Sequence, residues 1–354
     1  MKTLIEFEQL LAQLGARGGS ELFVRSGMKP VFRIDGVIVD ADVAAAPITV
    51  EDVAELVRQI LSPEQLERLT VARQTMVTVT LLGTQRFRLS ASIQGGAYAL
   101  VFRRITASIP SVATLKIPDS VQRAVFERGG LVLLIGPVDS GKTTTAAAIV
   151  QAINEREGRS IMTIESPIEY VFQPMKSVIV QRSVPDDVPD ATTALAFARD
   201  EGTDVAYLDH VKNQDEAQLL LDMSIGGRLV ITTVEAKTLA QAVSLFVGFF
   251  NQSEEHEVRD NLSQAFLVAL NQRLVPQRAG GRVLAFEVMM ANDSVRTMIR
   301  DGREQQLLQV VETSRGESMR TLDQHLVELV HAGIVEAPVA QRFAAQPDLI
   351  ARVT

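Results

Sequence analysis

The chain has 354 residues, of which 46% are hydrophobic and 22% are charged, a mixture typical of folded rather than disordered proteins. Its net charge of −8 disfavours non-specific binding to nucleic acid or anionic lipid, so we expect no nucleic-acid partner. The sequence has no cysteine, which excludes disulfides, iron–sulfur clusters, thiolate zinc sites and a cysteine nucleophile. The length exceeds that of one ordinary domain and predicts two.

The N-terminal segment has the pattern of a short amphipathic helix that ends at glycines. Glu6 and Glu8 lie where a signal peptide would need an apolar core. No stretch approaches the ~18 consecutive apolar residues of a membrane span. We therefore expect a soluble, cytoplasmic protein.

Residues 1–107 have the pattern of a small α+β domain. Short strand-like segments alternate with turns, and two helical patterns interrupt them at about 50–61 and 63–69. Residues 108–120 include Pro110 and Pro118 and have the composition of a linker. The predicted strands of this domain are 22–25, 31–34, 76–80, 85–92 and 98–102.

Residues 121–354 have the pattern of a wound α/β domain with a helical C-terminal region. Continuous apolar runs, separated by helical stretches, are typical of parallel strands that are buried on both faces. From about Glu254 onward the pattern predicts mostly helix, with one strand at 282–290. The predicted parallel strands are 131–135, 160–164, 205–208 and 229–233.

The strongest motif follows the first of these strands and opens a helix. It fits G-x-x-x-x-G-K-[ST], the phosphate-binding loop of P-loop nucleotide-binding proteins. In such a loop the glycines let backbone N–H groups face phosphate, and the lysine neutralises the β- and γ-phosphates. The hydroxyl of Thr143 can ligate Mg²⁺, so the expected cofactors are ATP and Mg²⁺. The expected binding residues are Gly136, Pro137, Val138, Asp139, Ser140, Gly141, Lys142, Thr143 and Thr144.

Several segments besides this motif resemble one family. Together with the phosphate loop they are 18–36, 86–105, 164–170, 205–250 and 319–335. They resemble the secretion-type motor ATPases, and among these the PilT/PilU family of type IV pilus retraction ATPases, with the C-terminal part more similar to PilU. The resemblance implies a PAS-like N-terminal domain, a RecA-like ATPase domain and a hexameric ring at the base of the pilus.

Two acidic motifs of the family are altered. The segment Ile164-Glu165-Ser166-Pro167-Ile168-Glu169 keeps both glutamates of the Asp box and has serine in place of its aspartate. The resemblance assigns activation of water to Glu169. In the Walker B segment 205–210, His210 replaces a glutamate that acts on Mg²⁺ in the family. Asp209 can take over this role only if the strand has ended there, because adjacent strand residues point to opposite faces.

Further departures surround the nucleotide site. Arg228 and Glu235 stand at the two histidines of the family's His box, and Asp139 replaces a loop glycine. Aspartate tolerates the left-handed backbone better than most residues, so the loop can keep its shape. A carboxylate directed at phosphate would cost about 4 kcal/mol, whereas one directed at water would cost ~1 kcal/mol or less.

Ring ATPases often supply an arginine across a subunit boundary to stabilise phosphate charge. The resemblance assigns this role to arginines of the N-terminal domain and linker. The candidates are Arg86, Arg88, Arg103 and Arg104, of which we expect two to be ordinary solvated arginines.

Three functions remain open at this stage. The chain is an ATP-binding ring subunit with impaired hydrolysis that acts with an active paralogue, a fully active retraction motor, or an unrelated P-loop enzyme. The end-to-end resemblance disfavours the third, and the altered motifs favour the first. The implied partners are further subunits of the same or a paralogous ATPase and the platform proteins of the pilus at the inner membrane.

Overall fold

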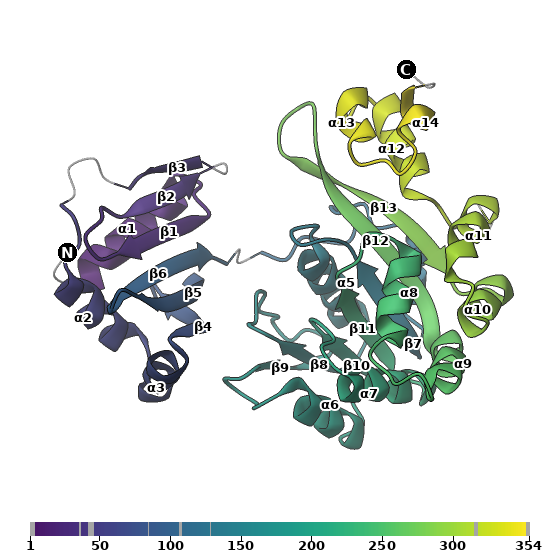
Figure 1. Cartoon of the computed structure of the whole chain (residues 1–354), viewed down its shortest axis with the longest axis horizontal. Coiled ribbons are helices and arrows are strands. Elements are labelled where there is room, and N and C mark those ends of the chain that lie inside the picture. The colour runs from purple at the N-terminus through teal and green to yellow at the C-terminus, as the bar shows by residue number, and fades with distance from the viewer. Residues whose placement is uncertain are drawn as a thin grey trace. The chain divides into compact units, whose positions relative to one another are not determined.

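The computed structural model describes residues 4–34, 37–41, 46–83, 85–105, 108–127, 129–314 and 318–351. The chain forms two compact units (Figure 1). The first comprises residues 1–108 together with 167–171, and the second comprises residues 109–166 and 172–354. The boundaries expected at residues 107 and 120 stay predictions. Among the described residues, no helix combines the length and the apolar character that a membrane span requires.

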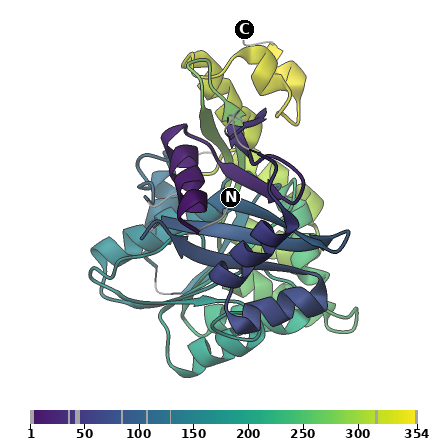
Figure 2. The same ribbon diagram turned by 90° about the vertical axis from the view of Figure 1, so that its left-hand side faces the viewer.

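The first unit is a six-stranded antiparallel sheet with the order β3-β2-β1-β6-β5-β4. Its helices cover one face of the sheet, as Figure 2 shows, and their apolar residues form one core with that face. Phe7 of the first helix packs against Phe102, with ring centroids 4.7 Å apart. The elements are α1 (Leu4–Ala16), β1 (Glu21–Arg25), β2 (Val31–Ile34), β3 (Val37–Asp40), α2 (Val50–Ile60), α3 (Pro63–Ala72), β4 (Gln74–Leu81), β5 (Gln85–Gln94) and β6 (Ala97–Arg104).

The second unit is built on a seven-stranded sheet with the order β13-β12-β7-β11-β10-β8-β9. All neighbouring strands are parallel except the antiparallel pair β12 and β13. Its strands are β7 (Gly130–Ile135), β8 (Ser160–Glu165), β9 (Val178–Ser183), β10 (Val205–Leu208), β11 (Leu229–Val234), β12 (Phe266–Pro276) and β13 (Arg282–Met290).

Helices lie on both faces of this sheet and continue beyond it into a helical C-terminal region (Figure 1). Every residue of β7, β10 and β11 is buried, as expected for parallel strands covered on both faces. The helices are α4 (Asp119–Ala124), α5 (Lys142–Arg156), α6 (Ala191–Asp200), α7 (Gln214–Ile225), α8 (Leu239–Val247), α9 (Glu255–Ala265), α10 (Asp293–Arg300), the 3-10 helix η1 (Glu304–Gln306), α11 (Leu307–Thr313), α12 (Leu322–His331), α13 (Ala337–Gln341) and α14 (Pro347–Ala351).

The expectation of a single strand after residue 254 is wrong. Helix α9 leads directly into β12, which pairs with β7 on one side and β13 on the other. The β12 sequence includes leucine, alanine, glutamine and arginine, all good helix formers, so local propensity disfavours a strand. Pairing with two neighbouring strands overrides that preference. The sequence pattern also does not predict β3 and β9, which are edge strands whose residues are mostly exposed or half-buried.

The parallel strands set the position of the site. Strands β7, β8, β10, β11 and β12 run in the same direction, so their carboxyl ends meet at one edge of the sheet. Strand β11 lies between β7 and β10. Ligands of open α/β sheets bind at this edge. The residues that follow β7, β8, β10 and β11 are therefore the first candidates for a site.

Candidate functional site

The loop between β7 and α5 has the shape that a phosphate-binding loop requires. Gly136 and Gly141 have φ of 158° and 88°, and Asp139 has φ of 61°. Aspartate thus occupies the left-handed conformation, as predicted, and the loop keeps its turn. Gly141 is the N-cap of α5, so the loop ends at the positive end of a helix dipole.

Neighbouring atoms also require glycine at the start of the loop. A Cβ atom on Gly136 would lie 2.3 Å from Oγ of Ser140 and 2.7 Å from the backbone oxygen of Gln272. Both contacts are shorter than real Cβ atoms tolerate. The loop is therefore folded tightly against β12, which leaves no room for a side chain at its first position.

Lys142 lies at the first position of α5 and is 9% exposed. Its ammonium donates hydrogen bonds to the backbone oxygens of Gly136 at 2.9 Å and Pro137 at 2.8 Å. These partners are neutral, so the cation is enclosed by the loop without a direct bond to a carboxylate among the described contacts. Such a cation is suited to bind an anion that enters the loop.

The charges around Lys142 are mostly acidic. Burial lowers the pKa of the Lys142 ammonium, and the charge of Arg273 acts in the same direction. The carboxylates of Glu235, Asp209 and Asp139 act against this shift, Glu235 most strongly. Three carboxylates therefore interact electrostatically with the one ammonium group of Lys142.

Strand β10 ends at Leu208, so Asp209 is the first residue beyond the strand. Its backbone oxygen accepts a hydrogen bond from the Thr233 hydroxyl, and its carboxylate accepts one from the Tyr207 hydroxyl at 3.1 Å. Its backbone N–H still donates to the backbone oxygen of Ile164 in β8 at 3.0 Å, so the role of Asp209 at Mg²⁺ stays a prediction. His210 is half-buried and is not among the charges that shift the pKa of Lys142.

The two positions of the His box lie at opposite ends of β11. Arg228 precedes the strand and donates a hydrogen bond to the backbone oxygen of Arg199 at 2.9 Å. Glu235 follows the strand, at the edge where the phosphate loop lies. Six strand residues separate them, about 20 Å of chain. Of these two residues, Glu235 is the one whose charge acts on Lys142 in the same chain.

The two glutamates of the Asp box have different environments. Glu165 ends β8, is 3% exposed and accepts a hydrogen bond from the Thr163 hydroxyl at 2.6 Å. Residues 167–171 cluster with the first unit, and Glu169 pairs there with Arg88 at 3.2 Å. Ser166 donates a hydrogen bond to the backbone oxygen of Val184. Glu165, which we did not select from the sequence, is therefore the Asp-box carboxylate at the carboxyl end of β8, a strand between β10 and the edge strand β9.

The four candidate arginines lie on the paired strands β5 and β6. Arg88 is directly opposite Arg103 in the antiparallel register, so these two side chains share one face of the sheet, together with Arg86 two residues from Arg88. Arg104 belongs to the other face and donates a hydrogen bond to the backbone oxygen of Gly15 at 3.4 Å. The strand pairing therefore brings three of the four together. Their role at a nucleotide stays a prediction.

Two residues of β12 that the sequence reading missed contact the nucleotide edge. The register aligns Asn271 with Ile135, so Gln272 lies level with Gly136. Gln272 is fully buried and donates a hydrogen bond to the backbone oxygen of Ser140 at 2.8 Å. Arg273 donates to the backbone oxygen of Lys237 at 2.6 Å. The sequence signal that could have indicated these residues is the polar triplet 271–273 within an otherwise apolar run.

A cavity of about 240 Å³ lies beside the start of α5. It is lined by Gly141, Thr144 and Thr145 of the loop and helix and by apolar residues including Leu274 and Leu284. The lining also includes polar and basic side chains, among them Lys116, Gln277 and Arg282. A cavity with both apolar and polar walls next to a phosphate loop has the chemistry to hold a nucleoside.

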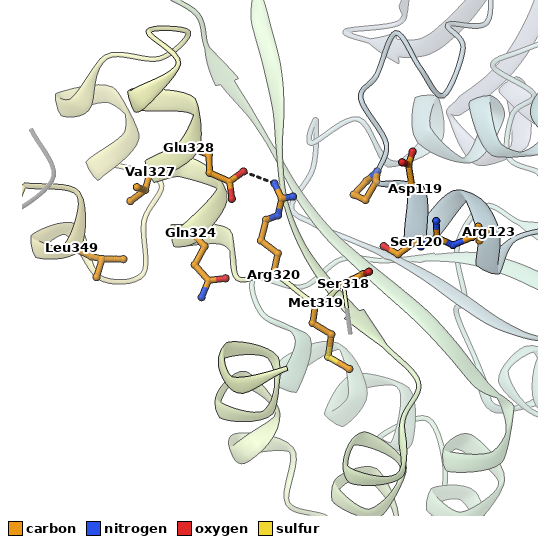
Figure 3. A pocket seen from close by; sticks show the side chains of 11 residues that line it. Asp119, Ser120, Arg123, Ser318, Met319, Arg320, Gln324, Val327, Glu328 and Leu349 are labelled. Carbon is orange, nitrogen blue, oxygen red and sulfur yellow. Dashed lines mark hydrogen bonds and ion pairs between the residues drawn. The ribbon is translucent and has the colours of Figure 1, made fainter. Parts of the chain in front are cut away.

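A cavity of about 720 Å³ lies elsewhere in the same unit, between α4 and α12 (Figure 3). Arg123 and Asp119 face it from α4, and Arg320 lies across from them. Arg320 already donates a hydrogen bond to Glu328 at 2.8 Å. The cavity is lined by both acidic and basic side chains, some of them already paired, so it has no clear preference for an anion. The phosphate loop is therefore the stronger candidate for a nucleotide site.

Comparison with known proteins identifies the family. Residues 114–341 match the family described as Type II/IV secretion system protein. The chain belongs to this family. It is 29% identical to the type IV pilus retraction ATPase PilT of Pseudomonas aeruginosa, over 97% of this chain and 99% of the relative. A crystal structure of the pilus retraction motor PilT with bound ADP superposes with a TM-score of 0.90 at 29% identity and covers 99% of both chains.

This membership confirms the resemblance to the PilT/PilU family and the predicted fold class, a RecA-like ATPase domain with a smaller PAS-like α+β domain and a helical C-terminal region. It does not separate PilT from PilU. The type IV pilus ATPase PilU of Pseudomonas aeruginosa is 28% identical over 93% of this chain and 86% of that protein. The closer likeness to PilU stays a prediction.

We expect Gly136→Ala to destabilise the second unit by about 1–3 kcal/mol, because the added methyl group must displace Ser140 or the backbone of β12. Gly158→Ala is the matched control, since its Cβ would lie 3.6 Å from the backbone oxygen of Lys176, an ordinary contact. Thermal and urea unfolding of both variants measure the difference. Equal stability of the two variants would contradict the tight packing of the loop.

Proposed function

We propose that this protein is a nucleotide-binding ring subunit of a type IV pilus retraction machinery that binds ATP with Mg²⁺ and hydrolyses it poorly. The observation that carries the proposal is the enclosed Lys142 in a loop of phosphate-binding shape. End-to-end similarity to PilT, whose structure was solved with bound ADP, supports the same function.

The residues present fit a nucleoside triphosphate. The backbone N–H groups of the loop 136–141, the start of α5 and Lys142 would hold the phosphates, and the neighbouring cavity would hold the nucleoside. The hydroxyl of Thr143 and the carboxylate of Asp209 are hard oxygen ligands that suit Mg²⁺. The bound ion would supply positive charge at the phosphates.

Electrostatics supports impaired hydrolysis. Glu235, Asp209 and Asp139 all place negative charge near Lys142, where phosphate charge must develop. In a partly buried site one like-charge contact at ~4 Å costs about 4 kcal/mol, so Glu235 and Asp139 weaken transition-state stabilisation. His210, in addition, supplies no negative charge for Mg²⁺ at neutral pH.

A fully active retraction motor is the second candidate. It is favoured by the position of Asp209 directly after β10, where its carboxylate acts on Lys142 and would take the place of the lost glutamate. In that case the subunit would need no active paralogue.

The proposed assembly is a closed ring, most simply a hexamer, of this chain alone or with a paralogous ATPase. Ring formation would bring N-terminal arginines of one subunit to a neighbouring nucleotide, with Arg88, Arg103 and Arg104 as candidates and Glu169 as the residue that activates water. The ring would act at the cytoplasmic side of the inner membrane on the pilus platform, with no nucleic-acid partner.

We expect Lys142→Ala to abolish binding of Mg-ATP, because it removes the only cation that the loop itself supplies to the phosphates. Lys176→Ala, which removes an exposed lysine of the same unit, is the control and should leave binding unchanged. Isothermal titration calorimetry measures both. Absence of binding to the unaltered protein at millimolar nucleotide would overturn the nucleotide site.

We expect His210→Glu to raise ATP turnover by about tenfold or more, because it restores a negative partner for Mg²⁺. His256→Glu makes the same charge change at an exposed position of α9 and should not raise it. Glu169→Ala in the His210→Glu protein should lower turnover again. Steady-state phosphate release measures all three, and an unaltered protein that already hydrolyses ATP as fast as an active motor would favour the second candidate.

A further inference from the structure

Asn271 lies at the centre of a buried polar network that joins β12, β13 and the loop after β11. Its side-chain nitrogen donates to the Glu287 carboxylate at 2.9 Å and to the backbone oxygen of Lys237 at 3.3 Å. Its side-chain oxygen accepts a hydrogen bond from Arg273 at 2.9 Å. Asn271 is 2% exposed, so water cannot easily replace these bonds. Both polar atoms of the Asn271 amide are thereby hydrogen-bonded.

The charge of Glu287 fixes the orientation of this amide. An ionised carboxylate only accepts hydrogen bonds, so it must face the nitrogen of Asn271 rather than its oxygen. The amide oxygen is then turned toward the guanidinium of Arg273. The amide orientation of Asn271 that donates to Glu287 is therefore also the orientation that accepts a hydrogen bond from Arg273.

Arg273 in turn holds the loop that follows β11. It donates to the backbone oxygens of Gln272 at 2.8 Å and Lys237 at 2.6 Å. Lys237 lies between Glu235, whose charge acts on Lys142, and Thr238, the N-cap of α8. The guanidinium therefore anchors the segment that places Glu235 at the nucleotide edge.

Glu287 has the surroundings of a group that can change charge near neutral pH. Burial raises the pKa of Glu287 to about 7, whereas the hydrogen bond from Asn271 and the charge of Arg273 act to lower it. Asp323 of α12 and Glu312 of α11 add negative charge that raises it. All of these except Arg273 line a cavity of about 180 Å³, whose lining also includes Lys237 and Glu304.

We propose that Arg273 is a positioning residue for the loop 235–238, and that the Asn271–Glu287 pair sets how firmly Arg273 holds this loop. When Glu287 is ionised, the Asn271 amide is locked and Arg273 is held between Asn271 and Lys237. When Glu287 takes up a proton, its hydroxyl can donate to the Asn271 oxygen, which frees the amide to turn its nitrogen toward Arg273. Two donors then face each other, and the guanidinium loses its bond to Asn271, so that only its bonds to the Gln272 and Lys237 backbone oxygens hold it in place.

The direction of the effect follows from these charges. The loop 235–238 should be held more firmly above about pH 7 and less firmly below it. A looser loop moves Glu235 relative to Lys142 and thereby changes the affinity for nucleotide. This last consequence rests on the proposed function, whereas the state of the loop does not.

Hydrogen-exchange mass spectrometry of a peptide that covers 235–241 tests the proposal on the full chain without nucleotide. After correction for intrinsic exchange, we expect exchange at about pH 6 to be about three- to tenfold faster than at about pH 8. Glu287→Gln, which keeps the shape and removes the charge, should exchange fast at both values. Glu328→Gln, which removes one carboxylate of the exposed pair with Arg320, is the matched control and should behave like the unaltered protein.

Arg273→Lys is a second variant that keeps the charge. Its single ammonium cannot reproduce the planar guanidinium that bonds Asn271 and Lys237 together, so the loop should exchange fast at both pH values. The proposal is overturned if Glu287→Gln keeps the pH dependence of the unaltered protein or if Arg273→Lys leaves exchange unchanged. A protein that binds no ATP would overturn the proposed function, and the exchange result would still decide this proposal.

Discussion

The pairing of β12 with β7 is the constraint on which the nucleotide edge depends. The parallel register aligns Asn271 with Ile135, the last residue before the phosphate loop, so the next two residues of β12 lie beside the loop itself. Gln272 bonds the loop through Ser140, and Arg273 bonds the segment after β11 through Lys237. Gly136 must be glycine because the backbone of β12 fills the space that a side chain would occupy. One strand therefore shapes the loop and its neighbour together.

Two departures from the family pattern share one physical property, negative charge near the same lysine. The carboxylates of Asp139 and Glu235, which are far apart in the sequence, both act on Lys142, together with Asp209. A lysine enclosed by the loop is suited to bind phosphate. Under the proposed function, each of these two carboxylates would oppose the charge that develops during hydrolysis.

Local features were predictable from the sequence, and long-range pairings were not. The phosphate loop is one contiguous segment, and its backbone turn depends on residues a few positions apart. The sequence motif was therefore sufficient to predict the shape of the loop. The left-handed backbone at Asp139 agrees with the tolerance of aspartate for this conformation at a position where the family has glycine. By contrast, β12 contains good helix formers, and its two neighbours make it a strand. The contacts of Asn271 with Glu287 and of Glu169 with Arg88 depend on strand pairing and chain folding, which no periodicity reveals.

The proposal that this protein binds ATP and turns it over slowly can be tested by measuring equilibrium ATP binding and steady-state hydrolysis on the same purified protein, alone and mixed with an active PilT-type ATPase. We expect saturable binding, with turnover ~10²-fold or more below that of the PilT-type ATPase alone. Turnover equal to that of the PilT-type ATPase would refute impaired hydrolysis and identify the protein as a working motor.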